Sequence, residues 1–558
     1  MPTFTKRGYF MKNSQETLSS QPKAFSKLRN FFWPIHGYEH KKLVPMFLLF
    51  LLISFIYNLL RCMKVALVVG GDAGSSAGAS VIPFLKVWGV LPSAVILTYF
   101  FTLLASRFNR EQVFYIVIAF FLSFFVLFTA FLHPNHELLE LVWLPQRLNN
   151  ILPAGFQGLI SAIQYWPTSL FYILSELWSS VVLSMLFWGY ANEVTTVEEA
   201  KRFYSIFALG ANASGIFSGQ IAQLMTFETL SQGMPFGRTA WEQTVILQIG
   251  LVLILGCVIL AIFRWLNTRV FVQSKENEGL SAAELFTRKK KNAVSLMASF
   301  QCLARSRYML YIAIVVVAYN IVYNLADVVW TDQINLQMQG ESSAINKYMN
   351  NVTSITGMLA TFSALFLSGN VIRRFGWTVT AMITPIIWLA MGIGVFGCML
   401  FQMNETVTGV LLQLFGVPIQ TLVVIFGSAQ ICMGRASKYT VFDESKEIAF
   451  IPLPKEEQRK GKAVVDGIAS RFGKAGGSLL IQVLLVACAS LANAIPYIAA
   501  IFFIVIVLWI YAVRNLGRIV KKAVDSTGSD PVTITVDEVS DRQADAVGPS
   551  QQKPVEAF

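Results

Sequence analysis

The sequence is poor in charged residues and in potential metal ligands. Only 14% of its 558 residues are Asp, Glu, Lys or Arg, whereas 55% are hydrophobic. It has four histidines and six cysteines, and the cysteines stand singly with no CxxC pair. The pattern predicts neither a disulfide framework nor a metal site, and the apolar composition excludes a soluble multidomain protein. We expect a polytopic membrane protein that needs no metal or other cofactor.

The net charge of +12 at pH 7 is distributed in a way that argues against nucleic-acid binding. Basic residues fall in short connections between apolar runs rather than along one stripe of a helix or one domain. Such a distribution indicates membrane topology. The expected surroundings are therefore the lipid bilayer and a transported small molecule, with no nucleic acid and no obligate protein partner.

Twelve apolar runs are long enough to cross a bilayer, which takes about 20 residues. Cations gather in alternate connections between these runs, which places both termini in the cytoplasm. The expected fold is therefore an all-α polytopic membrane protein with twelve transmembrane helices. The runs are 43–69, 81–105, 112–132, 167–191, 203–225, 243–266, 307–332, 348–369, 376–401, 408–433, 463–489 and 492–514.

An internal repeat divides the expected helices into two groups of six. The stretch "YNLLRCMKVALVV" from Tyr57 aligns with "YNIVYNLADVVWT" from Tyr319, and two further matches lie at nearly the same offset. Two six-helix repeats are typical of major facilitator transporters, whose substrate site lies near the midplane between them. The expected segments are a cytoplasmic N-terminal segment (1–42), a first bundle (43–266), a cytoplasmic linker (267–306), a second bundle (307–515) and a disordered cytoplasmic tail (516–558).

Among the ionisable residues inside the expected spans we single out six, because burying a charge there is costly and usually serves a function. Helical spacing places some of them on one face with polar or aromatic residues. The charged residues are Arg61, Lys64, Glu176, Asp327, Arg471 and Lys474. The polar and aromatic residues that could line a site with them, or stack on a base, are Tyr57, Asn320, Tyr323, Asn324 and Trp330.

These charges allow three interpretations. Lys64 could extend its ammonium to the nearby membrane surface, or Lys64 and Glu176 could form an ion pair that only docks two helices. In the third interpretation, which we favour, the four cations line a cavity and the two carboxylates are counter-charges. A cavity with surplus cations would bind a polyanion, and both Arg and Lys suit phosphate.

Four stretches of sequence carry a resemblance to a known family. They are "FFWPIHGYEHKKLVPMFLLF", "SELWSSVVLSMLFWGYANEVTTVEEAKRFY", "KYTVFDESKEIAFIPL" and "KGKAVVDGIASRFGKAGGSL". The chain resembles, over about residues 30 to 515, the nucleotide transporters of obligate intracellular bacteria and plastids, an ATP/ADP translocase family unrelated to the mitochondrial carrier. The family ties four charged membrane residues to transport, and by motif these are Lys64, Glu176, Asp327 and Lys474.

The chain departs from the family pattern near these residues. The family's first helix is usually more polar, and its seventh-helix carboxylate is typically Glu where Asp327 stands here. A basic residue often follows the Trp that matches Trp330, and this chain lacks it. In the first helix the polar family residues are replaced by Cys62, Met63, Val65 and Ala66.

The resemblance implies transport of ATP-like and ADP-like nucleotides by alternating access, with exchange as the first expectation. In this hypothesis Arg61, Lys64 and Lys474 hold the phosphates, with Arg471 as a further contact. Glu176 and Asp327 hold the cations when the site is empty. Alternatives are a proton-coupled nucleoside triphosphate symporter and an NAD/ADP exchanger. A proton-coupled peptide or sugar carrier and a membrane enzyme acting on nucleotides are rivals of other classes.

The sequence also bears on the membrane in which the protein lies and on two polar segments of the chain. The resemblance implies the inner membrane of a bacterium, with the plastid inner envelope as the alternative. The charged loop 434–461 is either a cytoplasmic gate or a solvated connection. His133 and His136 lie in "HPNH" and are expected to be solvated loop residues, because two histidines without further ligands rarely bind a metal.

Overall fold

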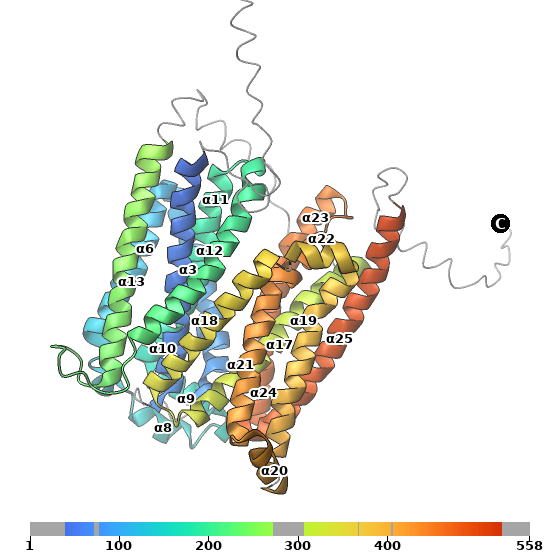
Figure 1. Cartoon of the computed structure of the whole chain (residues 1–558). Helices are drawn as coiled ribbons and strands as arrows, with labels where there is room; N and C mark the ends of the chain where they lie inside the picture. Colours follow the sequence, from blue (N-terminus) through green and yellow to red (C-terminus); the bar gives the residue numbers. More distant parts are fainter. Residues whose placement is uncertain (1–38, 72–77, 272–305, 367, 403–404, 527–558) are drawn as a thin grey trace, which may run out of the picture.

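The structure is a computed structural model that describes residues 39–71, 78–271, 306–366, 368–402 and 405–526. All regular elements in these ranges are helices (Figure 1). We call residues 39–271 the first half and residues 306–526 the second half. The end of the bundle where the first long helix begins and the last one ends is the termini face, and the other end is the opposite face (Figure 1).

The first half consists of helices that run between the two faces and short helices near the opposite face (Figure 1). In chain order they are α3 (His40–Val69), η3 (Gly78–Ser80), α4 (Val81–Phe84), η4 (Leu85–Val90), α5 (Leu91–Arg107), α6 (Arg110–Leu127), η5 (Phe128–Leu132), α7 (His136–Leu139), α8 (Trp143–Leu148), η6 (Ala154–Phe156), α9 (Gln157–Gln164), α10 (Trp166–Trp178), η7 (Ser179–Phe187), α11 (Trp188–Val194), α12 (Val197–Leu224), α13 (Ala240–Trp265) and η8 (Leu266–Phe271).

The second half has the same character. Its elements are α17 (Arg307–Gln337), α18 (Ser342–Phe366), α19 (Ser368–Phe401), α20 (Glu405–Phe415), α21 (Ile419–Ser437), η9 (Lys438–Phe442), α22 (Asp443–Ala449), α23 (Lys455–Lys462), η10 (Ala463–Ala469), α24 (Ser470–Cys488) and α25 (Leu491–Ser526). Several short elements, η4 and η9 among them, are π-helical turns inside longer helices. Such turns are rare and often mark functional sites.

Ten helical segments of the described chain are long and apolar enough to cross a membrane. They are His40–Val69, Gly78–Arg107, Arg110–Leu132, Trp166–Val194, Ala240–Arg269, Arg307–Gln337, Arg374–Phe401, Ile419–Ala449, Val464–Cys488 and Leu491–Lys521. Each overlaps one of the expected spans. The other two expected spans, 203–225 and 348–369, coincide with α12 and α18, which have 28 and 25 residues. These two helices are long enough but too polar to belong to the ten.

The polarity of α12 and α18 reflects their position, because the two helices pack against each other along the contact between the halves (Figure 1). Glycines permit this close approach. A Cβ atom on Gly219 would lie 2.2 Å from the Ser354 hydroxyl, and one on Gly357 would lie 2.8 Å from the Asn212 carbonyl oxygen. Small residues at a helix contact let backbones approach closely, so this pair faces protein more than lipid.

The structure corrects three of the expected boundaries. The expected span 408–433 is interrupted at Gly416, whose φ is +71°, and the crossing segment runs instead from Ile419 to Ala449. Residues 438–449 are therefore helical, where part of a loop was expected. The last helix continues to Ser526, so residues 516–526 are not a disordered tail. The rest of the expected tail, most of the N-terminal segment and most of the linker lie outside the described residues.

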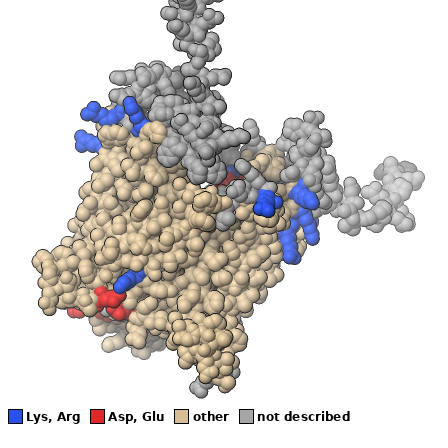
Figure 2. Space-filling model, viewed as in Figure 1, with Lys and Arg blue, Asp and Glu red and all other residues tan. Residues whose placement is uncertain are grey.

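The surface agrees with a membrane-embedded bundle. On the face seen in Figure 2, a broad area bears few charged side chains, and most of the visible Lys and Arg residues gather near the termini face. Apolar side chains are exposed along the helices, as Tyr99, Ile254 and Val507 illustrate. Exposed apolar area of this extent in a bundle of long helices indicates contact with lipid.

Candidate substrate site

The first part of the candidate site joins α3 to α17 across the two halves. The Arg61 guanidinium donates a hydrogen bond to the Tyr323 hydroxyl at 3.3 Å and lies 3.8 Å from the Asp327 carboxylate. The Tyr323 hydroxyl in turn donates to Asp327 at 3.2 Å. The i, i+4 spacing of Tyr323 and Asp327 places both on one face of α17. Arg61 of the first half and Asp327 of the second half thus face each other across the contact between the halves.

Lys86 of η4 is a second cation from the first half that reaches Asp327. Its ammonium donates to the Asn324 side-chain oxygen at 2.9 Å and lies 3.3 Å from the Asp327 carboxylate. The Lys86 and Asp327 side chains are each 17% exposed. A single carboxylate of the second half therefore receives two cations of the first half.

Arg435 of α21 and Lys438 of η9 add two cations from the second half. Arg435 is buried, donates to the Tyr323 hydroxyl and lies over the Tyr323 ring. Lys438 pairs with Asp443 at 3.0 Å. The Tyr323 hydroxyl thereby connects charged groups of three helices.

Lys64 and Glu176 form the other ion pair of the site, within the first half. Lys64 of α3 is only 3% exposed, and its ammonium contacts both the Glu176 carboxylate and the face of the Tyr172 ring. The Glu176 side chain is 34% exposed. Lys64 does not extend to a membrane surface, so the structure excludes that interpretation.

Arg471 and Lys474 lie on α24 near this cluster. Within the part of the chain that the structure describes, neither side chain takes part in the hydrogen bonds of the cluster. The Lys474 charge interacts with those of Lys86, Lys438 and Arg471. Both side chains belong to residues that are exposed in the structure. The structure therefore brings Lys474 into electrostatic range of Lys86 and Lys438 but pairs it with neither carboxylate.

The expected aromatic and polar lining divides into two groups. Tyr57, Tyr323 and Asn324 lie at the cluster, since the Tyr57 hydroxyl group interacts electrostatically with Arg61 and Asp327. Trp330 is instead buried in the second half, where its indole N–H donates to Ser428 at 3.0 Å. Asn320 donates to the Val316 carbonyl oxygen of its own helix, and its Cβ packs where a side chain on Gly473 would lie. Among the described residues, neither side chain hydrogen-bonds to a charged residue of the cluster.

Sequence reasoning missed three cations of the cluster, namely Lys86, Arg435 and Lys438. Lys86 is the one charged residue within the expected span 81–105, so the cost of burying it was a usable signal. Arg435 and Lys438 fell in the expected loop 434–461, where cations are ordinary. Only the helical continuation through η9 shows that both belong to the membrane-spanning bundle.

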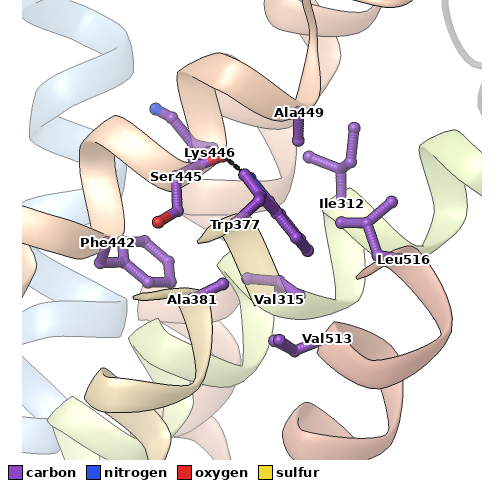
Figure 3. Close-up of a pocket in the computed structure, with 10 residues that line it drawn as sticks. All are labelled: Ile312, Val315, Trp377, Ala381, Phe442, Ser445, Lys446, Ala449, Val513 and Leu516. Atoms are coloured by element: carbon purple, nitrogen blue, oxygen red, sulfur yellow. Dashed lines mark hydrogen bonds between the residues drawn. The ribbon is translucent and has the colours of Figure 1, made fainter. Parts of the chain in front are cut away.

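A small cavity elsewhere in the second half has room for no more than a water-sized molecule. It measures about 20 Å³ and is mostly apolar (Figure 3). Figure 3 shows Trp377 donating to the Ser445 carbonyl oxygen beside it, at 2.8 Å. The space holds about one water molecule. Its lining residues are Ile312, Val315, Trp377, Ala381, Phe442, Ser445, Lys446, Ala449, Val513 and Leu516.

The described residues contain no group of three or more His, Cys, Asp or Glu side chains that could hold a metal ion. The histidines expected in a solvated loop behave otherwise. His133 is buried and stacks on Phe128, with ring centroids 5.5 Å apart, and both its ring nitrogens lack a hydrogen-bond partner. The Nδ1–H of His136 donates to the His133 carbonyl oxygen at 2.8 Å.

Long apolar helices with ionisable residues at the contact between two halves are typical of a membrane transporter. The chain belongs to the TLC ATP/ADP transporter family, whose family model matches residues 18–519. It is similar to ADP,ATP carrier protein 2 of Chlamydia pneumoniae, at 40% identity over 90% of this chain and 92% of that protein. The chloroplastic ADP,ATP carrier protein 1 of Arabidopsis thaliana is 34% identical over 85% of this chain and 73% of that protein.

Solved structures of other transporters share the fold. The inward open conformation of the xylose transporter XylE from E. coli superposes with a TM-score of 0.50 at 13% identity, over 85% of this chain and 94% of that one. A POT family transporter in complex with a thioalcohol-conjugated peptide has the same TM-score at 10% identity, over 85% of this chain and 96% of that one. These likenesses show that the chain shares the overall fold of these two proteins.

Proposed function

We propose that the chain exchanges nucleotides of the ATP and ADP class across a membrane by alternating access. The observation that carries the proposal is the excess of cations at the contact between the halves. Around this contact five cations meet three carboxylates: Arg61, Lys64, Lys86, Arg435 and Lys438 against Glu176, Asp327 and Asp443. An excess of buried positive charge favours a polyanionic ligand, and guanidinium and ammonium groups both suit phosphate.

In the proposed cycle the two carboxylates compete with the substrate for the cations. Asp327 engages Arg61 and Lys86 in the empty site, and the nucleotide phosphates draw both cations away from it. Arg471 and Lys474 line the path to the same phosphates, and Tyr57 and Tyr323 are the residues at the cluster able to contact the base. A ligand that contacts the two halves differently in each conformation shifts the equilibrium between them.

The membrane arrangement of this proposal uses twelve crossings. We take α12 and α18 as crossing helices together with the ten apolar segments, which gives two bundles of six. Both termini then lie on one side of the membrane, which the alternation of cations in the connections assigns to the cytoplasm. The proposed location is the inner membrane of a bacterium.

The test is uptake of labelled ATP, GTP, UTP, CTP and NAD into proteoliposomes that contain the full chain. Each nucleotide is tested with and without internal ADP, and with and without a proton uncoupler. Uptake that internal ADP stimulates and the uncoupler leaves intact is the expected result. Uptake that ignores internal ADP and collapses with the uncoupler would instead identify a proton symporter.

A variant pair tests whether the cation cluster carries this transport. Arg61→Gln is expected to abolish most ATP exchange, because it removes one of the cations opposite Asp327. Arg147→Gln, which changes an exposed cation of α8 beside Trp143, is the control and is expected to leave exchange intact. Equal activity of the two variants would contradict the proposed site.

A further inference from the structure

The π-helical turn η4 contacts the second half at two different places. Its Lys86 ammonium lies at the cation cluster, 2.9 Å from the Asn324 side-chain oxygen. Two residues later, the Trp88 indole N–H donates to the Gln482 side-chain oxygen of α24 at 3.1 Å. One short turn of the first half therefore touches both the candidate substrate site and a second point on the contact between the halves.

Both ends of the Gln482 amide group contact the first half, one at η4 and the other at α4 directly before it. While its oxygen accepts from Trp88, its nitrogen donates to the Pro83 carbonyl oxygen at 2.7 Å. Gln482 is 5% exposed. A buried amide whose two partners both belong to the other half is expensive to separate, because its polar atoms would lose their partners in a low-dielectric environment.

Further contacts between the halves lie near Gln482 and at the opposite face. Gln482 lies in the last third of α24, and near it a Cβ atom on Gly155 would lie 2.2 Å from the Leu485 carbonyl oxygen. At the opposite face the Gly71 N–H donates to the Gly340 carbonyl oxygen at 2.7 Å. These backbone contacts join the first half to the second, so opening this face must break the Gln482 bonds.

We propose that η4 couples the charge state of the substrate site to the closure of the opposite face, with Gln482 as the positioning residue that sets where Lys86 stands. The proposal rests on the proposed function, since it takes Lys86 as a group that meets the substrate phosphates. When phosphate draws Lys86 from Asp327 and Asn324, the turn that carries Lys86 also carries Trp88. A displacement of Lys86 therefore also shifts Trp88 and disturbs its hydrogen bond to Gln482.

A π-helical turn suits such a coupling element. Its hydrogen bonds span five residues instead of four, so a return to α-helical geometry would rotate the side chains that follow. Lys86 and Trp88 both lie inside the six residues of η4. A change of winding would therefore move two groups together: the Lys86 ammonium at the substrate site and the Trp88 indole N–H that bonds to Gln482.

The experiment is a double-mutant cycle on the KM for labelled ATP, measured with the full chain in proteoliposomes. Its variants are Lys86→Met, Gln482→Leu and the two combined. Each single variant is expected to raise KM about 5-fold or more, and the double variant is expected to go little beyond the larger single effect. Gln430→Leu is the matched control, because Gln430 is also buried but donates to Trp388 inside the second half.

If the KM of the double variant rises by the product of the two single-variant fold-changes, the two residues act independently and the proposed coupling is wrong. Trp88→Phe provides a second variant that removes only the indole donor and keeps an aromatic ring, and it is expected to raise KM in the same direction. A Trp88→Phe protein that matches the wild type in KM would also count against the proposal. If the wild-type protein takes up no nucleotide at all, the proposed function fails instead.

A thiol measurement tests the gate independently of transport. Cys62 is buried at the contact between the halves, with its sulfur 3.3 Å from the Thr353 hydroxyl oxygen of α18. With the other five cysteines replaced by serine, an impermeant maleimide applied to the opposite face should label Cys62 faster in Gln482→Leu than in Gln430→Leu. Equal labelling rates would overturn the role of Gln482 in closure.

Discussion

The Lys64 ammonium is the most deeply buried charge of the site, and Glu176 is its counter-ion. Lys64 is 3% exposed, whereas the Glu176 side chain is 34% exposed. Desolvation therefore weighs mainly on the lysine. Removing one partner of a buried pair leaves an uncompensated charge, and replacing both partners by neutral groups removes that cost.

This asymmetry predicts how variants of the pair will differ in stability. Glu176→Gln should lower the free energy of unfolding by about 3 kcal/mol, because Lys64 stays charged and buried. The double variant Lys64→Met with Glu176→Gln should recover most of that loss, although exchange should remain absent. Thermal unfolding in detergent measures both, and a double variant as unstable as the single one would contradict the argument.

His133 shows a different consequence of burial at the residue scale, at the end of a span. Burial lowers the pKa of its imidazole to about 4. Between that value and the ordinary His pKa of about 6.5, the unfolded chain binds a proton that the folded one excludes. The free energy of unfolding is therefore unaffected by His133 above about pH 6.5, and it decreases as the pH falls towards 4.

His133→Phe should flatten this pH dependence, because phenylalanine keeps the stacking on Phe128 and does not titrate. In the wild type the full loss is about 3 kcal/mol. Melting temperatures between pH 7 and pH 4.5 measure the slope of each protein. Parallel slopes for the two proteins would show that His133 is not the group responsible.

At the scale of elements, the α12–α18 contact depends on glycine. A Cβ atom on Gly219 would lie 2.2 Å from the Ser354 hydroxyl oxygen and 2.4 Å from the Asn350 carbonyl oxygen. The second of these atoms belongs to the backbone and cannot rotate away. Closure between the halves at this point therefore requires a residue without a side chain.

Gly219→Ala should weaken closure and lower the exchange rate about tenfold or more, since each 1.4 kcal/mol lost corresponds to a factor of ten. Gly250→Ala in α13 is the matched control. A Cβ atom there would meet nothing within 4 Å, and alanine is the better helix former. Initial exchange rates at equal protein density compare the two, and equal rates would refute the role of close packing.

At the scale of the whole molecule, a transporter that alternates must separate contacts between its halves in each cycle. One such contact joins Cys62 of α3 to Thr353 of α18, with the sulfur and the hydroxyl oxygen 3.3 Å apart. A second contact of the same type, Thr356 with Cys432, lies entirely within the second half at the same distance. The two pairs provide a matched comparison.

Thr353→Cys should form a disulfide with Cys62 under oxidation and stop exchange, and reduction should restore it. Thr356→Cys should cross-link to Cys432 with little effect, because those helices belong to one half. The measurement is the nucleotide exchange rate of each variant, first in the presence of an oxidant and then after a reductant is added. Continued exchange by a fully cross-linked Cys62 variant would show that the two halves do not part at this point.

Much of the fold follows from local sequence. Each of the ten apolar segments overlaps an expected span, and the break at Gly416 is the main exception, since a chain can turn within an apolar run without a polar signal. The pairing of Arg61 with Asp327 was not among the expectations. An ion pair of Lys64 with Glu176 was, as one of three interpretations, and it followed from the cost of isolated charge. The helical continuation of α21 beyond Ser437 did not, because its composition resembles that of a loop.

The sequence by itself determined that this protein is a bundle of membrane helices, because apolar length is a property of contiguous residues. It also singled out most charged residues of the site, because each buried charge is costly wherever its partner lies. Only the tertiary structure decided that Lys86 and Arg435 join them and that Gln482 spans the two halves. Hydrogen bonds and ion pairs act over a few ångströms, and helices distant in sequence reach that range only when the chain has folded.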